Sequence, residues 1–162
     1  MSERYLALQV LMMPKDTNGL VAPSLPGTLP NVPYMTIFGG VILSYIDQAG
    51  ALGARHEVLR AGGPLPFVVT VAFNRVEFKQ PVLVGDLVRF TTSLVRMGRS
   101  SVTIHVAVEA ERREQLLQVT EAEVVYVGID PTARERHGVP LLPQKEGEPG
   151  ASAPGWRERT GA

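Results

Sequence analysis

Residues 37–51 read Ile37-Phe38-Gly39-Gly40-Val41-Ile42-Leu43-Ser44-Tyr45-Ile46-Asp47-Gln48-Ala49-Gly50-Ala51. Apolar and small side chains recur here, and just beyond, at the spacing of one helix face: Ile42, Tyr45, Ile46, Ala49, Leu52, Gly53 and Leu59. This spacing predicts a helix from about Phe38 to about Arg60, ended by Ala61-Gly62-Gly63-Pro64. Each glycine inside a helix costs about 1 kcal/mol relative to alanine, so we expect another backbone to approach this helix closely.

The only acidic residue between Met35 and Arg55 is Asp47, in the middle of this apolar stretch. Burying an unpaired carboxylate is costly, so Asp47 is either solvated at an edge or has a function. Gly39 and Gly40 open the helix, where the first N–H groups lack intrahelical partners and an acyl oxygen or a phosphate can approach closely. Asp47 follows about two turns later, near enough for one small ligand to contact both features. The alternative, a loop terminus followed by a surface acid, fits this stretch equally well.

The composition is that of an ordinary globular protein. The chain has 162 residues, which suits one domain, and 44% of them are hydrophobic and 20% charged. Its 16 basic and 16 acidic residues cancel, which argues against a nucleic-acid-binding or membrane-surface protein. The absence of cysteine excludes disulfides, thiolate metal sites and cysteine nucleophiles. No apolar run reaches the length of a membrane span and the N-terminus lacks a signal-peptide pattern, so we expect a cytoplasmic protein.

The remainder of the chain predicts an antiparallel sheet. Period-two alternation and β-branched residues predict strands at about residues 5–13, 67–78, 87–97, 101–111 and 116–127. Short connections imply antiparallel pairing, and one long helix on one face of such a sheet is an α+β arrangement. We expect a single domain over residues 1–143, with a proline-rich segment at about 20–34 that cannot form regular structure. The Gly-, Pro- and charge-rich residues 144–162, with Trp156 alone among them, predict a disordered tail.

Most familiar catalytic patterns are missing from the sequence. The three histidines, His56, His105 and His137, show no metal-ligand spacing, and neither a serine-nucleophile elbow nor a nucleotide-binding glycine loop occurs. One basic turn remains, Arg96-Met97-Gly98-Arg99-Ser100-Ser101. Its glycine, hydroxyls and two arginines suit a phosphate group, although an ordinary hairpin tip with surface arginines has the same composition.

Four blocks of sequence occur in a fixed order. They are Met13-Pro14-Lys15-Asp16-Thr17-Asn18, the stretch 37–51, the stretch 69–86 with Val84-Gly85-Asp86 at its end, and Gly98-Arg99-Ser100-Ser101. Each block is weakly specific alone. The ordered set covers about Leu6 to Pro140 and resembles the hotdog-fold acyl-CoA thioesterases, in particular the short-chain bacterial type with the Ile-Phe-Gly-Gly signature.

This resemblance implies a fold, an assembly and a substrate. The fold would be a long central helix wrapped by a curved antiparallel sheet. The assembly would be a homodimer whose two active sites lie across the subunit interface, with further assembly into a hexamer as a trimer of dimers. The substrate would be acyl-CoA. No separate cofactor is implied because CoA is part of the substrate, and neither a nucleic acid nor a membrane is an expected partner.

The resemblance also implies residue roles. Asp47 matches the family's catalytic acid, which acts as general base for water or as direct nucleophile. Gly39 and Gly40 match the helix-start residues whose N–H groups polarise the thioester carbonyl. Asn18 matches an asparagine, contributed from the facing subunit, that helps to position the water or the thioester. The CoA phosphates would lie along the basic turn, at Arg96, Gly98, Arg99, Ser100 and Ser101.

One departure from the family concerns the asparagine. The proline-rich segment separates Asn18 from Phe38-Gly39-Gly40, whereas only a few residues separate the two blocks in the family. Either Asn18 keeps its role and the insertion loops outward, or Asn31 takes it; the intact Asp-Thr-Asn block favours Asn18. The insertion would lie beside the acyl end of the site and influence chain-length preference.

Two alternative functions stay open on the same fold. One is an acyl-CoA or acyl-carrier binding module without turnover, which would keep the phosphate turn and tolerate loss of Asp47. The other is a hotdog dehydratase, which pairs a histidine with an acid. Phe38 occupies the position where some relatives carry histidine, and no histidine follows Asp47 before His56, so the thioesterase is preferred.

Overall fold

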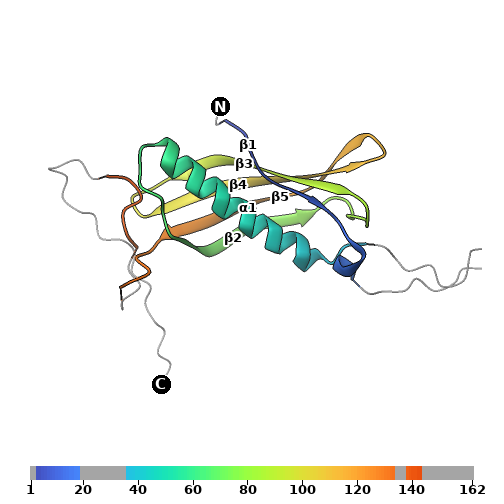
Figure 1. Ribbon diagram of the computed structural model, residues 1–162, viewed down its shortest axis with the longest axis horizontal. Helices are drawn as coiled ribbons and strands as arrows, with labels where there is room; N and C mark the ends of the chain where they lie inside the picture. The colour runs from blue at the N-terminus through green and yellow to red at the C-terminus, as the bar shows by residue number, and fades with distance from the viewer. Residues whose placement is uncertain (1–2, 19–35, 134–137, 144–162) are drawn as a thin grey trace, which may run out of the picture.

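The computed structural model describes residues 3–18, 36–133 and 138–143, and Figure 1 shows a long helix lying across one face of a sheet. The elements in chain order are β1 Tyr5–Leu11, a 3-10 turn Pro14–Asp16, α1 Gly39–Arg60, β2 Val68–Phe78, β3 Leu87–Met97, β4 Ser101–Arg112 and β5 Gln115–Gly128. The predicted α+β arrangement is therefore confirmed. The proline-rich segment, Asn31, His137 and the tail with Trp156 lie outside the described residues.

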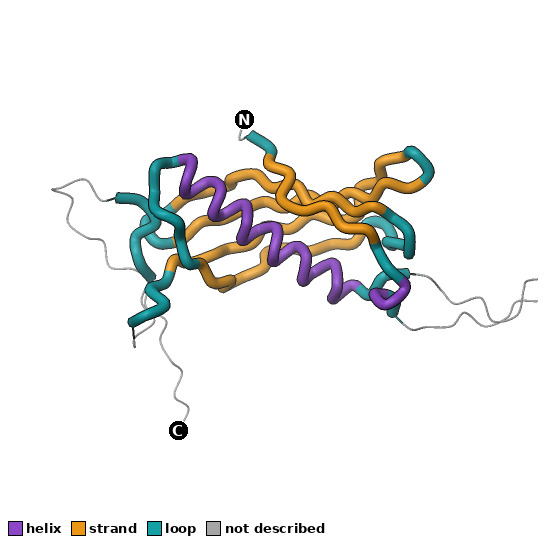
Figure 2. The backbone as a smooth tube through the Cα atoms, viewed as in Figure 1, coloured by secondary structure: helices purple, strands orange, loops and turns teal. Residues whose placement is uncertain are grey.

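The sheet has five antiparallel strands in the order β1-β3-β4-β5-β2. Figure 2 shows these strands in orange behind the purple helix. The predicted strands all form, with β1 ending at Leu11 rather than at Met13 because the chain turns at Pro14. β2 lies at one edge of the sheet, so its outer backbone groups have no strand partner within the part of the chain that the structure describes.

The hydrophobic core lies between α1 and the middle strands. On β4, Val102, Ile104, Val106 and Val108 are fully buried, as the period-two pattern predicts, although Ala107 between the last two is also buried. Burial of such side chains stabilises the fold by about 25 cal/mol for each Å² of apolar surface removed from water.

The buried face of α1 runs along its whole length. Its buried residues are Ile42, Ile46, Ala49, Gly50, Gly53, Ala54, Glu57 and Val58. The predicted stripe is right in its first half and wrong at Leu59, which is 49% exposed. Helical spacing from Ala54 places Val58 on the buried face and turns its neighbour away by about 100°.

The expected close approach of another backbone to the helix glycines is also wrong. A Cβ atom on Gly50 would lie 2.1 Å from the Tyr126 hydroxyl oxygen, and one on Gly53 would lie 2.6 Å from Oγ1 of Thr92. Both glycines therefore make room for side chains that rise from the sheet.

Candidate functional site

The start of α1 presents glycine backbone between two aromatic rings. The Phe38 amide donates to the Asp16 carbonyl oxygen at 2.9 Å, and the Val41 amide donates to the Phe38 carbonyl oxygen at 2.9 Å. The amides of Gly39 and Gly40 have no such carbonyl partner within the described residues. A Cβ atom on Gly40 would lie 2.4 Å from the Phe38 ring, so this position requires glycine unless the ring moves.

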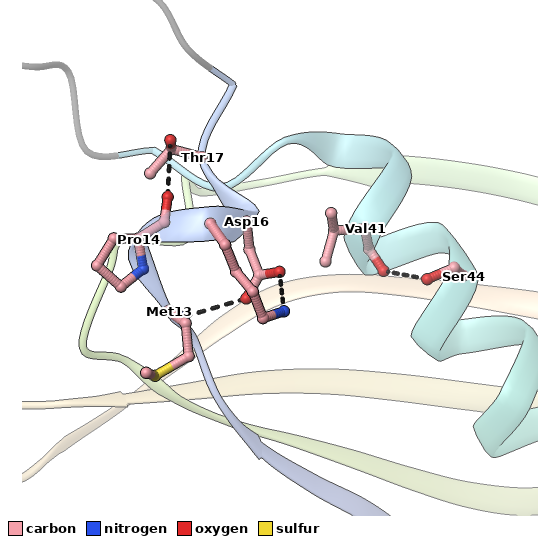
Figure 3. Close-up of polar contacts among 7 residues, drawn as sticks. Met13, Pro14, Asp16, Thr17, Val41 and Ser44 are labelled. Atoms are coloured by element: carbon pink, nitrogen blue, oxygen red, sulfur yellow. Dashed lines mark hydrogen bonds and ion pairs between the residues drawn. The ribbon is translucent and has the colours of Figure 1, made fainter.

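A tight turn braces this helix start, and Figure 3 shows it beside the first turn of α1. The buried Asp16 carboxylate accepts the Met13 amide at 3.1 Å and the Lys15 ammonium at 2.7 Å. The hydrogen bond from Lys15, together with the Met13 amide, holds the pKa of Asp16 below its usual range. The turn is therefore fixed by an ionised carboxylate.

Asn18 lies at the end of this turn, next to the strand-like residues that precede the helix. Its amide donates to the Thr36 carbonyl oxygen at 3.0 Å, and its Nδ2 donates to Oγ1 of Thr36 at 2.7 Å. Thr17 and Ile37 form an antiparallel bridge beside this pair. The two chain ends that flank residues 19–35 are thus joined, which keeps Asn18 beside the helix start as the preferred interpretation requires.

A groove of about 410 Å³ opens beside Gly39. Its lining is mainly apolar, with a polar rim, and consists of Thr36, Ile37, Gly39, Ile42, Phe78, Lys79, Gln80, Pro81 and Val82. Phe38 and Phe78, which flank the helix start, keep 57% and 44% of their surface exposed. Exposed aromatic surface at a concave site is typical of a place that binds an apolar group.

An ion pair between the buried Asp86 and the partly exposed Arg112 braces residues next to this groove. Arg112 donates to Asp86 from Nε at 2.9 Å and from Nη2 at 2.6 Å, and Asp86 also accepts the Leu83 amide at 2.9 Å. Val82, the next residue back, accepts the Ile37 amide at 2.8 Å. The pairing raises the pKa of Arg112. Asp86 belongs to the Val84-Gly85-Asp86 block, but the sequence gives no sign that Arg112 is its partner.

The Asp47 carboxylate is half-buried and held by hydroxyl groups. Thr70 of β2 donates from Oγ1 to Oδ1 of Asp47 at 2.5 Å. Tyr126 of β5 donates to the Asp47 carbonyl oxygen at 2.8 Å and lies 3.5 Å from Oδ1. Among the described residues no cation pairs with Asp47. The Asp47 side chain therefore has defined protein partners, which favours the functional interpretation over a surface acid.

Sequence reasoning missed both partners of Asp47. Thr70 and Tyr126 face each other across the β2–β5 ladder, and a register shift follows directly between Thr70 and Ala72. Such bulges re-aim side chains, and their positions depend on strand pairing rather than on local pattern. The sequence block Val69-Thr70-Val71-Ala72 was the only available signal.

The basic turn joins β3 to β4 at the opposite end of the sheet from the helix start (Figure 1). Gly98 donates its amide to the Ser101 carbonyl oxygen at 2.7 Å, and Arg99 accepts the Leu141 amide at 2.9 Å. The Leu141 carbonyl oxygen also lies against Gly63, just past the end of α1. The side chains of Arg96 and Arg99 are exposed. One chain alone therefore does not bring this turn to Gly39 and Gly40.

The described histidines have structural partners. His56 stacks on Tyr5 with ring centroids 4.1 Å apart, and His105 Nε2 lies 3.4 Å from the Glu121 carboxylate. Within residues 3–18, 36–133 and 138–143, no group of three or more His, Cys, Asp or Glu side chains could hold a metal ion. None of the helices in those ranges combines the length and the hydropathy needed to cross a membrane.

Comparison with known proteins places the chain in one family. Residues 34–117 match the family model described as the thioesterase superfamily. The chain is 32% identical over 136 residues to the acyl-CoA thioester hydrolase YciA of Salmonella typhimurium, covering 81% of this chain and 87% of the relative. The match to YciA of Escherichia coli is 33% identical and covers 81% and 88% of the two chains.

Solved structures show the same fold. The hexameric thioesterase y2039 of Yersinia pestis superposes with a TM-score of 0.66 at 31% identity, covering 86% of this chain and 98% of that one. The hexameric broad-specificity acyl-coenzyme A thioesterase HI0827 superposes with a TM-score of 0.68 at 28% identity, covering 90% and 86%. A variant of HI0827 with an aspartate replaced by alanine superposes similarly, with a TM-score of 0.65.

Proposed function

Because this chain belongs to the hotdog-fold thioesterase superfamily and is an acyl-CoA thioester hydrolase, we propose that Asp47 drives cleavage of acyl-CoA into a free acid and CoA. The observation that carries this proposal is the Asp47 carboxylate itself. Oδ1 accepts the hydrogen bond of the Thr70 hydroxyl, and Oδ2 has no hydrogen-bond partner within the described residues, so one carboxylate oxygen is left for a substrate group or water. The aspartate-to-alanine variant of HI0827 shows that an aspartate of that relative was chosen for study.

Two chemical routes are open to this carboxylate. As a general base, Asp47 takes a proton from water while the hydroxide adds to the thioester carbonyl carbon. The C–S bond then breaks, and the departing CoA thiolate takes up the proton. As a nucleophile, Asp47 adds to the same carbon and expels CoA thiolate, and water then hydrolyses the acyl–Asp47 anhydride. Both routes need the charged carboxylate, and neither needs a cation beside it.

The oxyanion of either route needs hydrogen-bond donors, and we assign these to the amides of Gly39 and Gly40. A well-aimed donor at such a position contributes about 3–4 kcal/mol to the transition state. The positive end of the α1 dipole adds to the same effect. The exposed Phe38 and Phe78 rings lie beside these amides, so a bound acyl group that covers them would exclude water and strengthen the interaction.

The two halves of this machinery come from two subunits. Gly39 and Asp47 are eight residues apart on α1, which is about 12 Å along the helix axis. A donor to the carbonyl oxygen and an attacking group at the carbonyl carbon lie only about 3 Å from those atoms. Asp47 of one subunit therefore acts on a thioester bound at the helix start of its partner. The edge strand β2, with exposed Val69 and Phe73, is the surface that we assign to this dimer.

The remaining residues bind the substrate. Asn18, fixed beside the helix start, positions the thioester or the water. The acyl chain enters the apolar groove behind Phe78 and Val82. The pantetheine arm leads away to the turn of Arg96, Gly98, Arg99, Ser100 and Ser101, which holds the phosphates. Because the relatives y2039 and HI0827 are hexameric, we expect dimers of this chain to assemble further into a hexamer.

A thiol-release assay across acyl-CoA chain lengths tests the proposed function. We expect repeated turnover with release of free CoA, and loss of that turnover in Asp47→Asn while acyl-CoA still binds. Stoichiometric binding without thiol release in the native protein would instead favour the binding module.

Subunit mixing tests the two-subunit site. Gly39→Pro removes one amide donor at the first helical position, where proline is well tolerated and a Cβ atom has room. Mixing Asp47→Asn subunits with Gly39→Pro subunits makes half of the dimers mixed, each with one intact site, and restores about a quarter of native activity. Two inactive parents that stay inactive after mixing would place both groups in one subunit.

A further inference from the structure

We propose that Tyr126 is a positioning residue for Asp47. We also propose that Gly50 is a glycine because only the absence of a side chain there leaves room for the Tyr126 hydroxyl group beside α1. This inference rests on the proposed function, because positioning matters only if Asp47 attacks the thioester or activates water. It adds a residue from β5, far from Asp47 in sequence, to the machinery of the site.

The Tyr126 hydroxyl contacts the backbone of α1 at Asp47. Tyr126 is 1% exposed, and its hydroxyl donates to the Asp47 carbonyl oxygen at 2.8 Å. A phenol has one hydrogen, so the 3.5 Å approach to Oδ1 of Asp47 is a secondary contact. Within the helix the same carbonyl accepts the amide four residues later, which makes Tyr126 a second donor to it. The sheet thereby holds the backbone of α1 at the residue that carries the carboxylate.

Thr70 completes this arrangement from the neighbouring strand. Thr70 and Tyr126 are direct cross-strand partners, so both hydroxyls rise from one rung of the β2–β5 ladder. Thr70 fixes the carboxylate through Oδ1, and Tyr126 fixes the backbone that bears it. Rotation of the side chain and translation of the helix are thus controlled separately.

Gly50 makes the contact possible. A Cβ atom there would lie 2.1 Å from the Tyr126 hydroxyl oxygen and 2.9 Å from the ring carbon that bears it. Any larger side chain would push the ring out of reach of Asp47. The glycine weakens the helix by about 1 kcal/mol relative to alanine, which is a cost that the contact explains.

The hydroxyl stays protonated under assay conditions. Burial, and then the nearby Asp47 charge, raise the pKa of Tyr126 far above its ordinary value. It therefore acts as a neutral hydrogen-bond donor to the Asp47 backbone.

Gly53 provides a matched control on the same helix face. A Cβ atom there would lie 2.6 Å from Oγ1 and 2.8 Å from Cβ of Thr92, so alanine at Gly53 meets crowding similar to that at Gly50. Thr92 has no hydrogen bond to Asp47 among the described contacts, and its hydroxyl donates to the Tyr5 carbonyl oxygen. Gly53→Ala should therefore reduce stability without disturbing Asp47.

The test measures kcat, KM and thermal stability of the full-length protein with acyl-CoA. Tyr126→Phe deletes the donor with little change of volume, and we expect kcat to fall about three- to tenfold with KM within a factor of two. Gly50→Ala should lower kcat about a hundredfold. Its effect should shrink in the Tyr126→Phe background, because the hydroxyl that clashes is gone.

Three outcomes would overturn the inference. Native kcat in Tyr126→Phe would remove the positioning role, and it decides the matter even if Gly50→Ala fails to fold. Equal kcat losses in Gly50→Ala and Gly53→Ala would reduce both to general destabilisation. Effects of Gly50→Ala and Tyr126→Phe that simply multiply would show that the two residues act independently. Retained turnover in Asp47→Asn is a different result, because it removes the proposed function itself.

Discussion

The two halves of α1 each carry one acidic side chain, and the protein surrounds the two carboxylates differently. Asp47 in the first half is half-buried; its carboxylate accepts a hydrogen bond from the Thr70 hydroxyl, and its backbone carbonyl accepts one from the Tyr126 hydroxyl. Glu57 in the second half is 4% exposed and lies 3.4 Å from the Arg60 guanidinium, which also pairs with Glu3 at 2.6 Å. Glu57 is thus the more buried acid and the one with a charged partner.

If Asp47 is the catalytic acid, as proposed, then burial alone does not mark a functional carboxylate. A cation beside Glu57 neutralises its charge and fixes its position, which suits a structural role. Hydroxyl groups fix Asp47 in place but leave its charge available for reaction. The nature of the partner, rather than the exposed fraction, separates the two acids.

The largest predicted effect is on kcat, and it distinguishes the two acids when each is neutralised in a separate variant. Asp47→Asn keeps the shape and the Thr70 hydrogen bond but removes the charge, so we expect kcat to fall by about 10²- to 10⁴-fold. Glu57→Gln is the matched change in the other half and should leave kcat within about twofold of native, since Glu57 lies about three helical turns from Asp47 and pairs with Arg60. Steady-state thiol release by both variants checks this pair. Comparable losses in the two would end the distinction between the halves.

The next effect concerns the amides at the start of α1. Gly39→Pro deletes one N–H donor, and the extended Phe38 backbone before it, with φ −62° and ψ 128°, already suits a residue that precedes proline. We expect kcat to fall by about 10²-fold. Gly39→Ala adds a side chain but keeps the N–H, and its Cβ would lie 3.7 Å from the Phe78 ring, so it is the steric control. If both variants lose the same activity, crowding rather than a missing donor is responsible.

The free energy of unfolding should depend mainly on the ion pair of Glu57 and Arg60 in the second half of the helix. Arg60→Met leaves the buried Glu57 without its cation, and removing one member of a buried pair costs about 3–5 kcal/mol. The Arg60 side chain is 45% exposed, so solvent screening reduces the expected loss of unfolding free energy to about 2–3 kcal/mol. Chemical denaturation measures it, and kcat of the folded protein should not change. Adding Glu57→Gln to Arg60→Met should recover most of the loss; no recovery would mean that the arginine acts through its Glu3 contact.

The sequence predicts the helix and the strands better than it predicts which side chains contact the acidic residues. Helical spacing and the Gly62-Gly63-Pro64 stop predict α1, and alternation predicts β3 from Leu87 to Met97, because these patterns are local. The partners of Asp47 depend on the β2–β5 register and on a bulge after Thr70, which no local pattern specifies. The ion pair of Asp86 and Arg112 depends on long-range contacts in the same way.

The candidate site residues stay predictions, and they stand out in the sequence for a different reason. An acid, Asp47, and two glycines, Gly39 and Gly40, stand in an otherwise apolar helix. These residues conflict with the local preference for apolar helix formers, and such conflicts often indicate a functional site. The sequence gives no sign that Glu57 is buried, because it lies near charged neighbours such as Arg55 and Arg60, where an exposed acid is ordinary. The sequence gives no sign of the contact between Tyr126 and Asp47, because a tyrosine is an ordinary residue of a strand.

A smaller effect should come from the basic turn, which lies near the second half of the helix rather than the first. Arg99→Ala should raise KM for acyl-CoA about tenfold, the loss of about 1.4 kcal/mol expected for one phosphate contact. Thioesters of pantetheine, which lack the nucleotide phosphates, should be unaffected. Arg55→Ala removes an exposed arginine from the helix itself and is the charge control. Equal increases in KM for both classes of substrate would contradict a phosphate contact.

The smallest effect should come from a third acid, Asp16, which pairs with a cation (Lys15) as Glu57 pairs with Arg60, but lies beside the start of α1. Its folded-state pKa is lowered, first by the Lys15 hydrogen bond, so it stabilises the fold at pH values above the ordinary 3.8. That stabilisation is lost as the pH falls through the lowered value. Asp16→Asn should therefore cost about 1 kcal/mol of unfolding free energy at pH 7, mainly through the Met13 amide bond, and progressively less below pH 4. Urea denaturation at a series of pH values measures the difference. Lys15→Met removes only the cation and should reproduce a minor part of it, whereas a loss in Asp16→Asn that is constant across this range would show that the charge of Asp16 does not hold the turn.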